Sequence, residues 1–177
     1  MNFQTLPSTT HELIALRRLV RDDIPYWFDY LTLPTVFEHT SWDVKSPSEL
    51  ERYAEIPDAP ASMLRLAIVG RTNNQLVGTI GFHTVSPDNR SAEIAYDLSP
   101  AWWGKGVASH ACNVMVEWAH RHVGLRRVQA TVLESNLRSI RVLQRCGFDR
   151  EGLLRSYRMV RGRPGDFWMY SHIDGAC

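Results

Sequence analysis

A Gly-Lys-Gly segment, Gly104–Gly106, is the first feature of this sequence that could bind a charged ligand. It follows a strand-like segment that ends at Leu98 and precedes a helical pattern that begins at Val107. Glycines at a strand-to-helix junction let backbone N–H groups come close to an anion, and the helix N-terminus adds partial positive charge. The segment therefore favours a phosphate ligand, although glycines also serve in ordinary turns.

Two well-known phosphate-binding motifs do not fit this segment. In a P-loop the lysine follows the second glycine, whereas Lys105 lies between the two glycines. The dinucleotide-binding fingerprint needs a third glycine, where this chain has Ser109, and it needs a preceding parallel strand. The strand expected at 92–98 instead ends an antiparallel meander. Both nucleotide-binding classes are therefore disfavoured.

Three segments together resemble one enzyme superfamily. Trp103-Gly-Lys-Gly-Val-Ala108 looks like the Gln/Arg-x-x-Gly-x-Gly/Ala motif of the Gcn5-related N-acetyltransferases (GNAT), with Trp103 where Gln or Arg is usual. Ala92-Glu-Ile-Ala-Tyr96 and Asn136-x-x-Ser139-x-x-x-Leu-x-x-x-Gly147-Phe148 resemble its RimJ/RimL-like branch, the bacterial ribosomal-protein N-terminal acetyltransferases. The resemblance runs from about residue 13 to 173 and implies a GNAT fold and an acetyl-CoA-dependent enzyme.

The resemblance also implies where coenzyme A lies. Backbone amides of the glycine segment would hold the pyrophosphate, and a backbone N–H near Leu98 would stabilise the developing oxyanion. Strand 92–98 would diverge from strand 128–133, with pantetheine in the gap. Asn136 would contact the ligand, although it could equally cap a helix. The expected cofactor-binding residues are Leu98, Trp103, Gly104, Lys105, Gly106, Val107, Ala108, Ser109 and Asn136.

Glu93 is the expected base, or amine anchor, for direct attack of a primary amine on the thioester. An α-amino group has a pKa of about 7.7–8.0 and must lose a proton before it attacks. Strand alternation places Glu93 and Asp97 on one face, although both could be ordinary solvent-facing acids. Many members of the superfamily protonate the leaving thiolate with a tyrosine where this chain has Leu143. Ser139 and Tyr157 are the expected replacements.

The elements that must position these residues follow from the hydrophobic periodicity. It predicts a mixed α/β (α+β) sheet in the order β-α-α-β-β-β-α-β-α-β-β, with six to seven strands and about four helices. We expect one domain over residues 1–177, with a core at about 13–173. Strands are expected at 13–20, 64–70, 76–85, 92–98, 128–133, 153–160 and 167–173, and helices after Asp23, near 46–50, at 107–118 and at 136–146. In the GNAT fold that the resemblance implies, the first helices and the last hairpin would line the acceptor groove, with Trp27, Phe37 and Trp42 as substrate-binding residues.

Composition narrows the function further. The formal net charge of +1 provides no global attraction for nucleic acid or an anionic membrane. No apolar run approaches the roughly 20 residues that span a bilayer, and the first residues lack a signal-peptide pattern. Cys112, Cys146 and Cys177 suit a reducing compartment, so we expect a cytoplasmic protein. Neither the cysteine spacing nor the pair His120 and His122 predicts a metal site.

Acetyl transfer from acetyl-CoA to a primary amine is the leading hypothesis. A protein N-terminal α-amine comes ahead of a small-molecule amine, such as a polyamine, an amino acid derivative or an antibiotic. The absence of the usual tyrosine at position 143 keeps a second class open, a non-catalytic acyl-CoA-binding module. The expected partner is an amine acceptor, and a homodimer is an alternative that the sequence leaves undecided.

Overall fold

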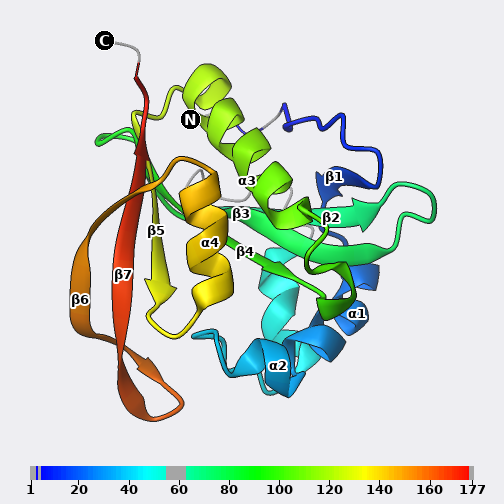
Figure 1. Ribbon diagram of the computed structural model, residues 1–177. Coiled ribbons are helices and arrows are strands. Elements are labelled where there is room, and N and C mark those ends of the chain that lie inside the picture. The colour runs from blue at the N-terminus through cyan, green and yellow to red at the C-terminus, as the bar shows by residue number, and fades with distance from the viewer. Residues whose placement is uncertain (1–2, 4, 55–62, 176–177) are drawn as a thin grey trace.

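The computed structural model describes residues 3, 5–54 and 63–175, and Figure 1 shows their arrangement. They form one mixed sheet with helices on both faces, which confirms the predicted α/β class. Cys177 lies outside the described residues. Within those ranges, no helix has both the length and the apolar character needed to cross a bilayer.

Seven strands make up the sheet: β1 (Ile14–Arg18), β2 (Leu64–Gly70), β3 (Leu76–Ser86), β4 (Ser91–Leu98), β5 (Arg127–Leu133), β6 (Asp149–Val160) and β7 (Arg163–Ile173). They lie in the order β1-β2-β3-β4-β5-β7-β6, and every neighbouring pair is antiparallel except β4 and β5. The β2-β3-β4 meander and the closing hairpin are therefore as predicted. Strand β6 begins four residues earlier than expected, because charged residues at its start hide the strand pattern.

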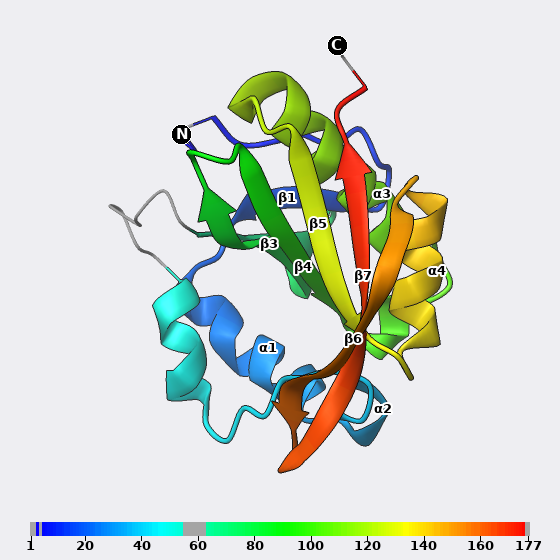
Figure 2. The same cartoon turned by 90° about the vertical axis from the view of Figure 1, so that its left-hand side faces the viewer.

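Four α-helices pack on the sheet: α1 (Ile24–Leu31), α2 (Pro34–Phe37), α3 (Val107–Trp118) and α4 (Leu137–Arg145). Helices α3 and α4 cover one face of the sheet, and α1 and α2 lie on the other (Figure 2). The helix expected near 46–50 is a 3-10 helix, Pro47–Tyr53, and Ser46 with Glu49 caps its start. Gly124 ends the helical segment that continues from α3, with a φ of 78°.

The sheet divides the apolar core into two layers, because successive strand residues point to opposite faces. On β2, Leu66 and Ile68 pack in the layer under α3 and α4. Ala67 and Val69 belong to the opposite layer, which α1 and the 3-10 helix cover. Each face therefore presents its own set of side chains to any ligand that enters the sheet from that side.

The parallel pair β4 and β5 opens into a gap. Their pairing covers only residues 91–93 of β4 and 127–129 of β5. Beyond it, β4 stays paired to β3 up to Leu98, and β5 stays paired to β7 up to Leu133. The divergence expected from the sequence is therefore confirmed. Backbone groups on the facing edges of these two strands are left without a partner strand.

Candidate active site

Two cavities meet at the gap between β4 and β5. The smaller cavity, of about 370 Å³, lies between the Gly104–Ser109 segment and α4. The larger cavity, of about 720 Å³, lies among β3, β4, β5 and the loop after α2. Both volumes lie in the range of ligand-binding sites. The residues that line both cavities mark the passage between them: His39, Thr40, Tyr96, Asn136 and Ser139.

The glycine segment lines the smaller cavity at the start of α3. Gly104 and Gly106 both have a φ of 76°, which favours glycine, and Gly106 immediately precedes the helix. A Cβ atom at either position would meet nothing within 4 Å, so the space in front of the helix is open. Lys105 does not line the cavity, since its amine lies over the Trp102 ring at 4.9 Å. The open helix N-terminus is suited to bind an anion.

Trp103 ties this segment to its neighbours. Its indole Nε1–H donates to the Leu98 carbonyl at 2.9 Å, and the Arg138 guanidinium lies 4.3 Å from its ring centroid. Trp103 therefore holds the segment against both β4 and α4. Val107, Ala108 and Ser109 also line the smaller cavity.

The backbone of β4 presents hydrogen-bonding groups to the gap. The Ser99 N–H donates to the Val77 carbonyl of β3 at 2.8 Å. Neighbouring backbone groups of a strand point to opposite edges, so the N–H groups of Leu98 and Tyr96 face the gap. An extended ligand in the gap could pair with this edge.

Tyr96 lies at the passage between the cavities. Its hydroxyl is 2.9 Å from the Ser139 hydroxyl and donates to the Ser139 carbonyl at 3.2 Å. Burial, with a smaller contribution from the nearby Cys112, raises the pKa of Tyr96 well above its ordinary value. The phenol therefore keeps its proton at neutral pH and can donate it.

Glu93 lies buried beneath the wall of the larger cavity, with 6% of its surface exposed. One carboxylate oxygen, Oε1, is 2.5 Å from the Thr131 hydroxyl, 3.1 Å from Arg158 Nη2 and 3.3 Å from His83 Nε2. Burial alone would raise the pKa of Glu93, but the hydrogen bonds from His83 and Thr131 and the charges of His83 and Arg158 lower it to about 2. So acidic a carboxyl is a weak base at neutral pH.

The comparisons with known proteins agree with this geometry. The sequence matches the acetyltransferase (GNAT) domain family over residues 14–149. The chain belongs to the GNAT acetyltransferase family. It is 30% identical over 164 residues to the N-acetyltransferase p20 of Bacillus licheniformis, across 90% of this chain and 92% of that protein. It is also 30% identical over 100 residues to the ribosomal-protein-serine acetyltransferase of Escherichia coli (strain K12), across 56% of each protein.

A solved structure shares the fold over nearly the whole chain. The microcin C7 self-immunity acetyltransferase MccE, crystallised in complex with acetyl-CoA and AMP, superposes with a TM-score of 0.81. It is 21% identical and covers 96% of this chain and 98% of that chain. This GNAT protein is an acetyl-CoA-dependent N-acetyltransferase of the branch that includes the ribosomal-protein enzymes. In the part of the chain that the structure describes, no group of three or more His, Cys, Asp or Glu could hold a metal ion.

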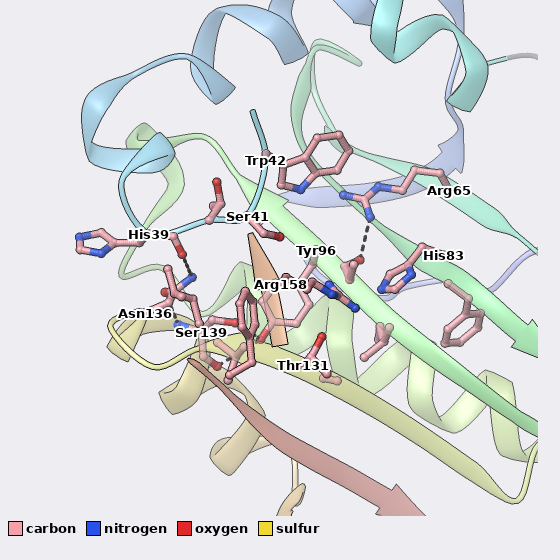
Figure 3. A pocket seen from close by; sticks show the side chains of 18 of the residues that line it. His39, Ser41, Trp42, Arg65, His83, Tyr96, Thr131, Asn136, Ser139 and Arg158 are labelled. Atoms are coloured by element: carbon pink, nitrogen blue, oxygen red, sulfur yellow. Dashed lines mark hydrogen bonds between the residues drawn. The ribbon is translucent and has the colours of Figure 1, made fainter. Parts of the chain in front are cut away.

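Asn136 has two structural roles in this acetyltransferase. Its Oδ1 accepts from the Ser139 N–H at 3.1 Å, so it caps α4 as the sequence allowed. Its Nδ2 donates to the His39 carbonyl at 2.9 Å, and Figure 3 shows this bond at the passage. Asn136 thereby ties the helix start to the loop after α2.

The solvent-facing alternative for Glu93 and Asp97 is wrong, because both carboxylates are buried. Asp97 accepts hydrogen bonds from Thr79 at 2.7 Å and from Trp27 Nε1 at 3.2 Å. It also accepts from Tyr30 and pairs with the Arg65 guanidinium. Asp97 therefore serves as the buried acceptor that joins α1 to the sheet.

The aromatic residues expected in the acceptor groove are only partly there. Trp42 lines the larger cavity (Figure 3). Trp27 has no exposed surface and packs edge-on against Trp42, so it supports the wall from behind. Phe37 lies under the Arg161 guanidinium, outside both cavities. Tyr157, which was expected as a proton donor, is 42% exposed and packs against Phe167 instead of lining a cavity.

Arg161 holds the cavity loop, residues 39–44, which lines the larger cavity throughout. From the turn between β6 and β7, its guanidinium donates to the carbonyls of Phe37, Glu38 and Thr40 at 2.9–3.0 Å. These carbonyls lie at and just beyond the end of α2, where a cation is favourable. Together with Asn136, Arg161 fixes the cavity loop from the last hairpin of the chain.

Several residues of the site were not predicted from the sequence, among them His83, Tyr96, Arg158 and Arg161. Tyr96 stood in the quoted Ala92–Tyr96 segment, but strand alternation assigns it to the face opposite Glu93. A cavity can be lined by side chains from both faces of the sheet only because β4 and β5 diverge. Arg158 and Arg161 lie far from Glu93 and the cavity loop in sequence, and no local signal connects them. His83 lies on the neighbouring strand, and only the bulge in β3 aims it at Glu93.

Proposed function

We propose that this enzyme transfers the acetyl group of acetyl-CoA to the N-terminal α-amine of a protein. The observation that carries the proposal is the meeting of the two cavities at Tyr96 and Ser139. The Gly104–Ser109 segment forms a phosphate-binding cradle in the smaller cavity. The larger cavity is open enough to admit the end of a polypeptide. The gap between β4 and β5 is then the place where the two substrates react.

On the cofactor side, the chain offers backbone groups in three places. The N–H groups of Gly104–Ser109 would hold the pyrophosphate at the start of α3. The free edge of β4 would pair with the extended pantetheine arm. The Leu98 N–H would bind the thioester oxygen, a contact worth about 2.7–4 kcal/mol in comparable sites. When bound, acetyl-CoA supplies the activated acetyl thioester.

On the acceptor side, the larger cavity takes the amine. Its volume of about 720 Å³ is in the upper part of the range for small-molecule sites, which favours several residues of a chain end over a single small amine. The relative from Escherichia coli is a ribosomal-protein-serine acetyltransferase, which supports a protein acceptor. Acetylation of a small-molecule amine is the alternative acceptor class.

Tyr96 and Ser139 are the groups that we assign to proton donation. The amine nitrogen bonds to the acetyl carbon as the carbon–sulfur bond breaks. Tyr96, directly or through the Ser139 hydroxyl, donates the proton that the leaving sulfur takes. This pair supplies the donor that Leu143 cannot, and it argues against a catalytically silent module.

Glu93 is assigned to positioning. With a pKa of about 2 it stays ionised at neutral pH and holds Arg158 and His83 in the cavity wall. The α-amine, with a pKa of about 7.7–8.0, reaches the site partly neutral, and the open cavity lets its proton pass to solvent.

We also propose the compartment, the domain organisation and the partners of the enzyme. A cytoplasmic enzyme acting as a single domain over residues 1–177 fits the free, buried Cys112 and Cys146. We expect neither nucleic acid nor a membrane as a partner, and a homodimer remains an alternative.

The direct test is coenzyme A release with a panel of acceptors. Peptides with free N-termini, the same peptides with blocked N-termini, polyamines and free amino acids would each be mixed with enzyme and acetyl-CoA. We expect turnover only with free N-termini, and mass spectrometry should place the acetyl group on the α-amine. Turnover confined to polyamines would contradict the proposal, and so would tight acetyl-CoA binding without turnover on any acceptor.

A further inference from the structure

Two β-bulges aim side chains at Glu93 from opposite sides of the larger cavity. The pairing of β3 with β4 shifts between Phe82 and Thr84, which leaves His83 as an extra residue. In the hairpin, Leu154 pairs with Phe167 and Arg158 pairs with Gly165, so β6 carries two extra residues there. Bulges of this kind re-aim side chains in functional sites.

The bulge in β6 is held by specific contacts. Ser156 has a φ of 52°, in the left-handed region, and its N–H donates to Asp166 Oδ1 at 2.7 Å. Beyond the bulge, Arg158 lies against the Tyr157 ring at 4.8 Å and reaches Glu93. The Arg158 guanidinium is therefore placed in the cavity wall by the backbone, and Figure 3 shows it among the side chains that line this cavity.

Arg158 lies between Glu93 and the cavity, and part of its guanidinium is free to donate to a ligand. Glu93 does not line the cavity, whereas Arg158, Thr131 and His83 do. The Arg158 side chain is 34% exposed, against 7% for Glu93. Of its guanidinium nitrogens, only Nη2 has a hydrogen bond among the described residues, so Nε and Nη1 are left to bind a ligand. A ligand in this cavity meets the guanidinium before it meets the carboxylate.

The acids that do line the cavity are occupied by their own loop. Asp43 pairs with Lys45, and Glu49 accepts from the N–H groups of Lys45 and Ser46 at the start of the 3-10 helix. Two other arginines line the cavity. Arg65 is neutralised by the buried Asp97, and Arg52 lies over the Tyr53 ring and donates to the Tyr53 hydroxyl at 2.9 Å. Arg158 is the arginine of the wall that reaches Glu93 on β4, and its remaining donors are set up to receive an anionic group from the acceptor.

The spacing along β4 between the partner of Arg158 and the passage suits a peptide. Its partner Glu93 and the passage residue Tyr96 are three residues apart on β4, which is about 10 Å along a strand. An extended peptide advances about 3.3–3.6 Å per residue, so an amine at the passage places the second or third side chain near Arg158.

We infer that the enzyme prefers acceptor proteins with an acidic side chain at the second or third residue, which Arg158 binds. This inference rests on the proposed function and names the acceptor class of the same site. A planar guanidinium is well suited to a carboxylate, because it can donate two parallel hydrogen bonds.

The experiment measures kcat/KM, at saturating acetyl-CoA, for peptides that differ only at positions two and three. Each position carries glutamate, alanine or lysine in turn. We expect kcat/KM about tenfold higher for glutamate than for alanine, and lower still for lysine. The preference should shrink as salt is added, because Arg158 is partly exposed.

Two variants separate recognition from folding. Arg158→Gln should bring the glutamate-to-alanine ratio close to one, and Arg158→Lys should keep part of the preference. Arg155→Gln, on the same strand but exposed, should leave the ratio unchanged. The ratio is the readout, because loss of Arg158 also unpairs Glu93 and can lower every rate together. If Arg158→Gln does not fold, the salt dependence of the unaltered enzyme decides.

The outcomes distinguish this inference from the proposed function. Equal, efficient acetylation of glutamate and alanine peptides would overturn the inference and leave the function standing. A preference that survives in Arg158→Gln would overturn it as well. If free amino acids react and no peptide does, the proposed protein acceptor itself fails.

Discussion

At the scale of single residues, the site depends on which titratable groups keep their protons. Tyr96 and Glu93 lie on the same strand but are shifted in opposite directions. Burial raises the pKa of Tyr96, while the surrounding hydrogen bonds and cations outweigh burial and lower the pKa of Glu93. At neutral pH Tyr96 therefore keeps its proton, and Glu93 carries a negative charge.

Replacing Tyr96 with Phe should test the proton donor. We expect kcat to fall about 10²-fold, because the ring still packs but the hydroxyl bonded to Ser139 is gone. The Kd for acetyl-CoA, measured by calorimetry, should stay close to that of the unaltered enzyme. Tyr157→Phe is the matched comparison, since Tyr157 lies outside both cavities, and it should keep most of the activity. Reversed effects of the two substitutions would reassign the donor to Tyr157.

Glu93 gives a prediction for stability against pH. Its pKa is lowered in the folded chain, so its ionised form stabilises the fold above its unfolded pKa of about 4.3, and this contribution is lost as the pH falls towards 2. Between pH 6 and pH 2.5, the unaltered protein should lose roughly 2–3 kcal/mol more free energy of unfolding than Glu93→Gln. Urea titrations at several pH values measure the difference. Parallel pH curves for the two proteins would show that the carboxylate is not stabilised by its partners.

At the scale of elements, the cradle depends on a backbone conformation that only glycine adopts without cost. Gly106 and Gly162 provide a matched pair, because both have a φ of 76° and open space where a Cβ would lie. Gly106 precedes α3, whereas Gly162 is in the turn between β6 and β7.

Substituting alanine at each glycine should separate strain from binding. Each substitution should lower the free energy of unfolding by about 1 kcal/mol, because the left-handed conformation is unfavourable for alanine. Only Gly106→Ala should also raise the Kd for coenzyme A, by about tenfold or more, since its methyl group enters the space in front of the helix. Calorimetric titration measures both Kd values. Equal Kd values would mean that the anion lies elsewhere.

The elements were largely predictable, and their long-range contacts were not. Helix α3 has an apolar face at helical spacing and a glycine at its start, so its bounds could be predicted closely. The cradle could be predicted for the same reason, as a local sequence motif. The Arg158 and Arg161 contacts could not, because they depend on a bulge and a turn whose partners lie more than 60 residues away. Trp27 shows a further limit, since an aromatic residue on a helix looks the same whether it lines a groove or supports one.

At the scale of the whole molecule, one buried network joins the sheet to helix α1. Asp97 on β4 binds Thr79 of β3, Arg65 of β2, and Trp27 and Tyr30 of α1. It thus connects the wall of the larger cavity to the helical layer that supports it. A buried ion pair adds little net stability, but removing one partner leaves an uncompensated charge.

Asp97→Asn should therefore be costly. We expect the free energy of unfolding to fall by about 3–5 kcal/mol, since Arg65 would stay buried without its counterion. Glu117→Gln removes an exposed pair with Arg121 and should change the free energy of unfolding by at most about 0.5 kcal/mol. Urea denaturation of the three proteins measures both effects. Equal losses in the two variants would mean that Arg65 gains access to water.

The hydrogen bonds by which Arg161 holds the cavity loop have a consequence for the order in which the enzyme's sites are completed during synthesis. The cradle, the β4 edge and Tyr96 are all complete by residue 109, and Ser139 follows within the next thirty residues. The Thr40 carbonyl of the cavity loop, however, waits for Arg161, and Glu93 waits for Arg158. The residues of the cofactor site would thus be synthesised before those that hold the acceptor cavity. Acceptor binding would begin only once the final hairpin has left the ribosome and closed on the loop.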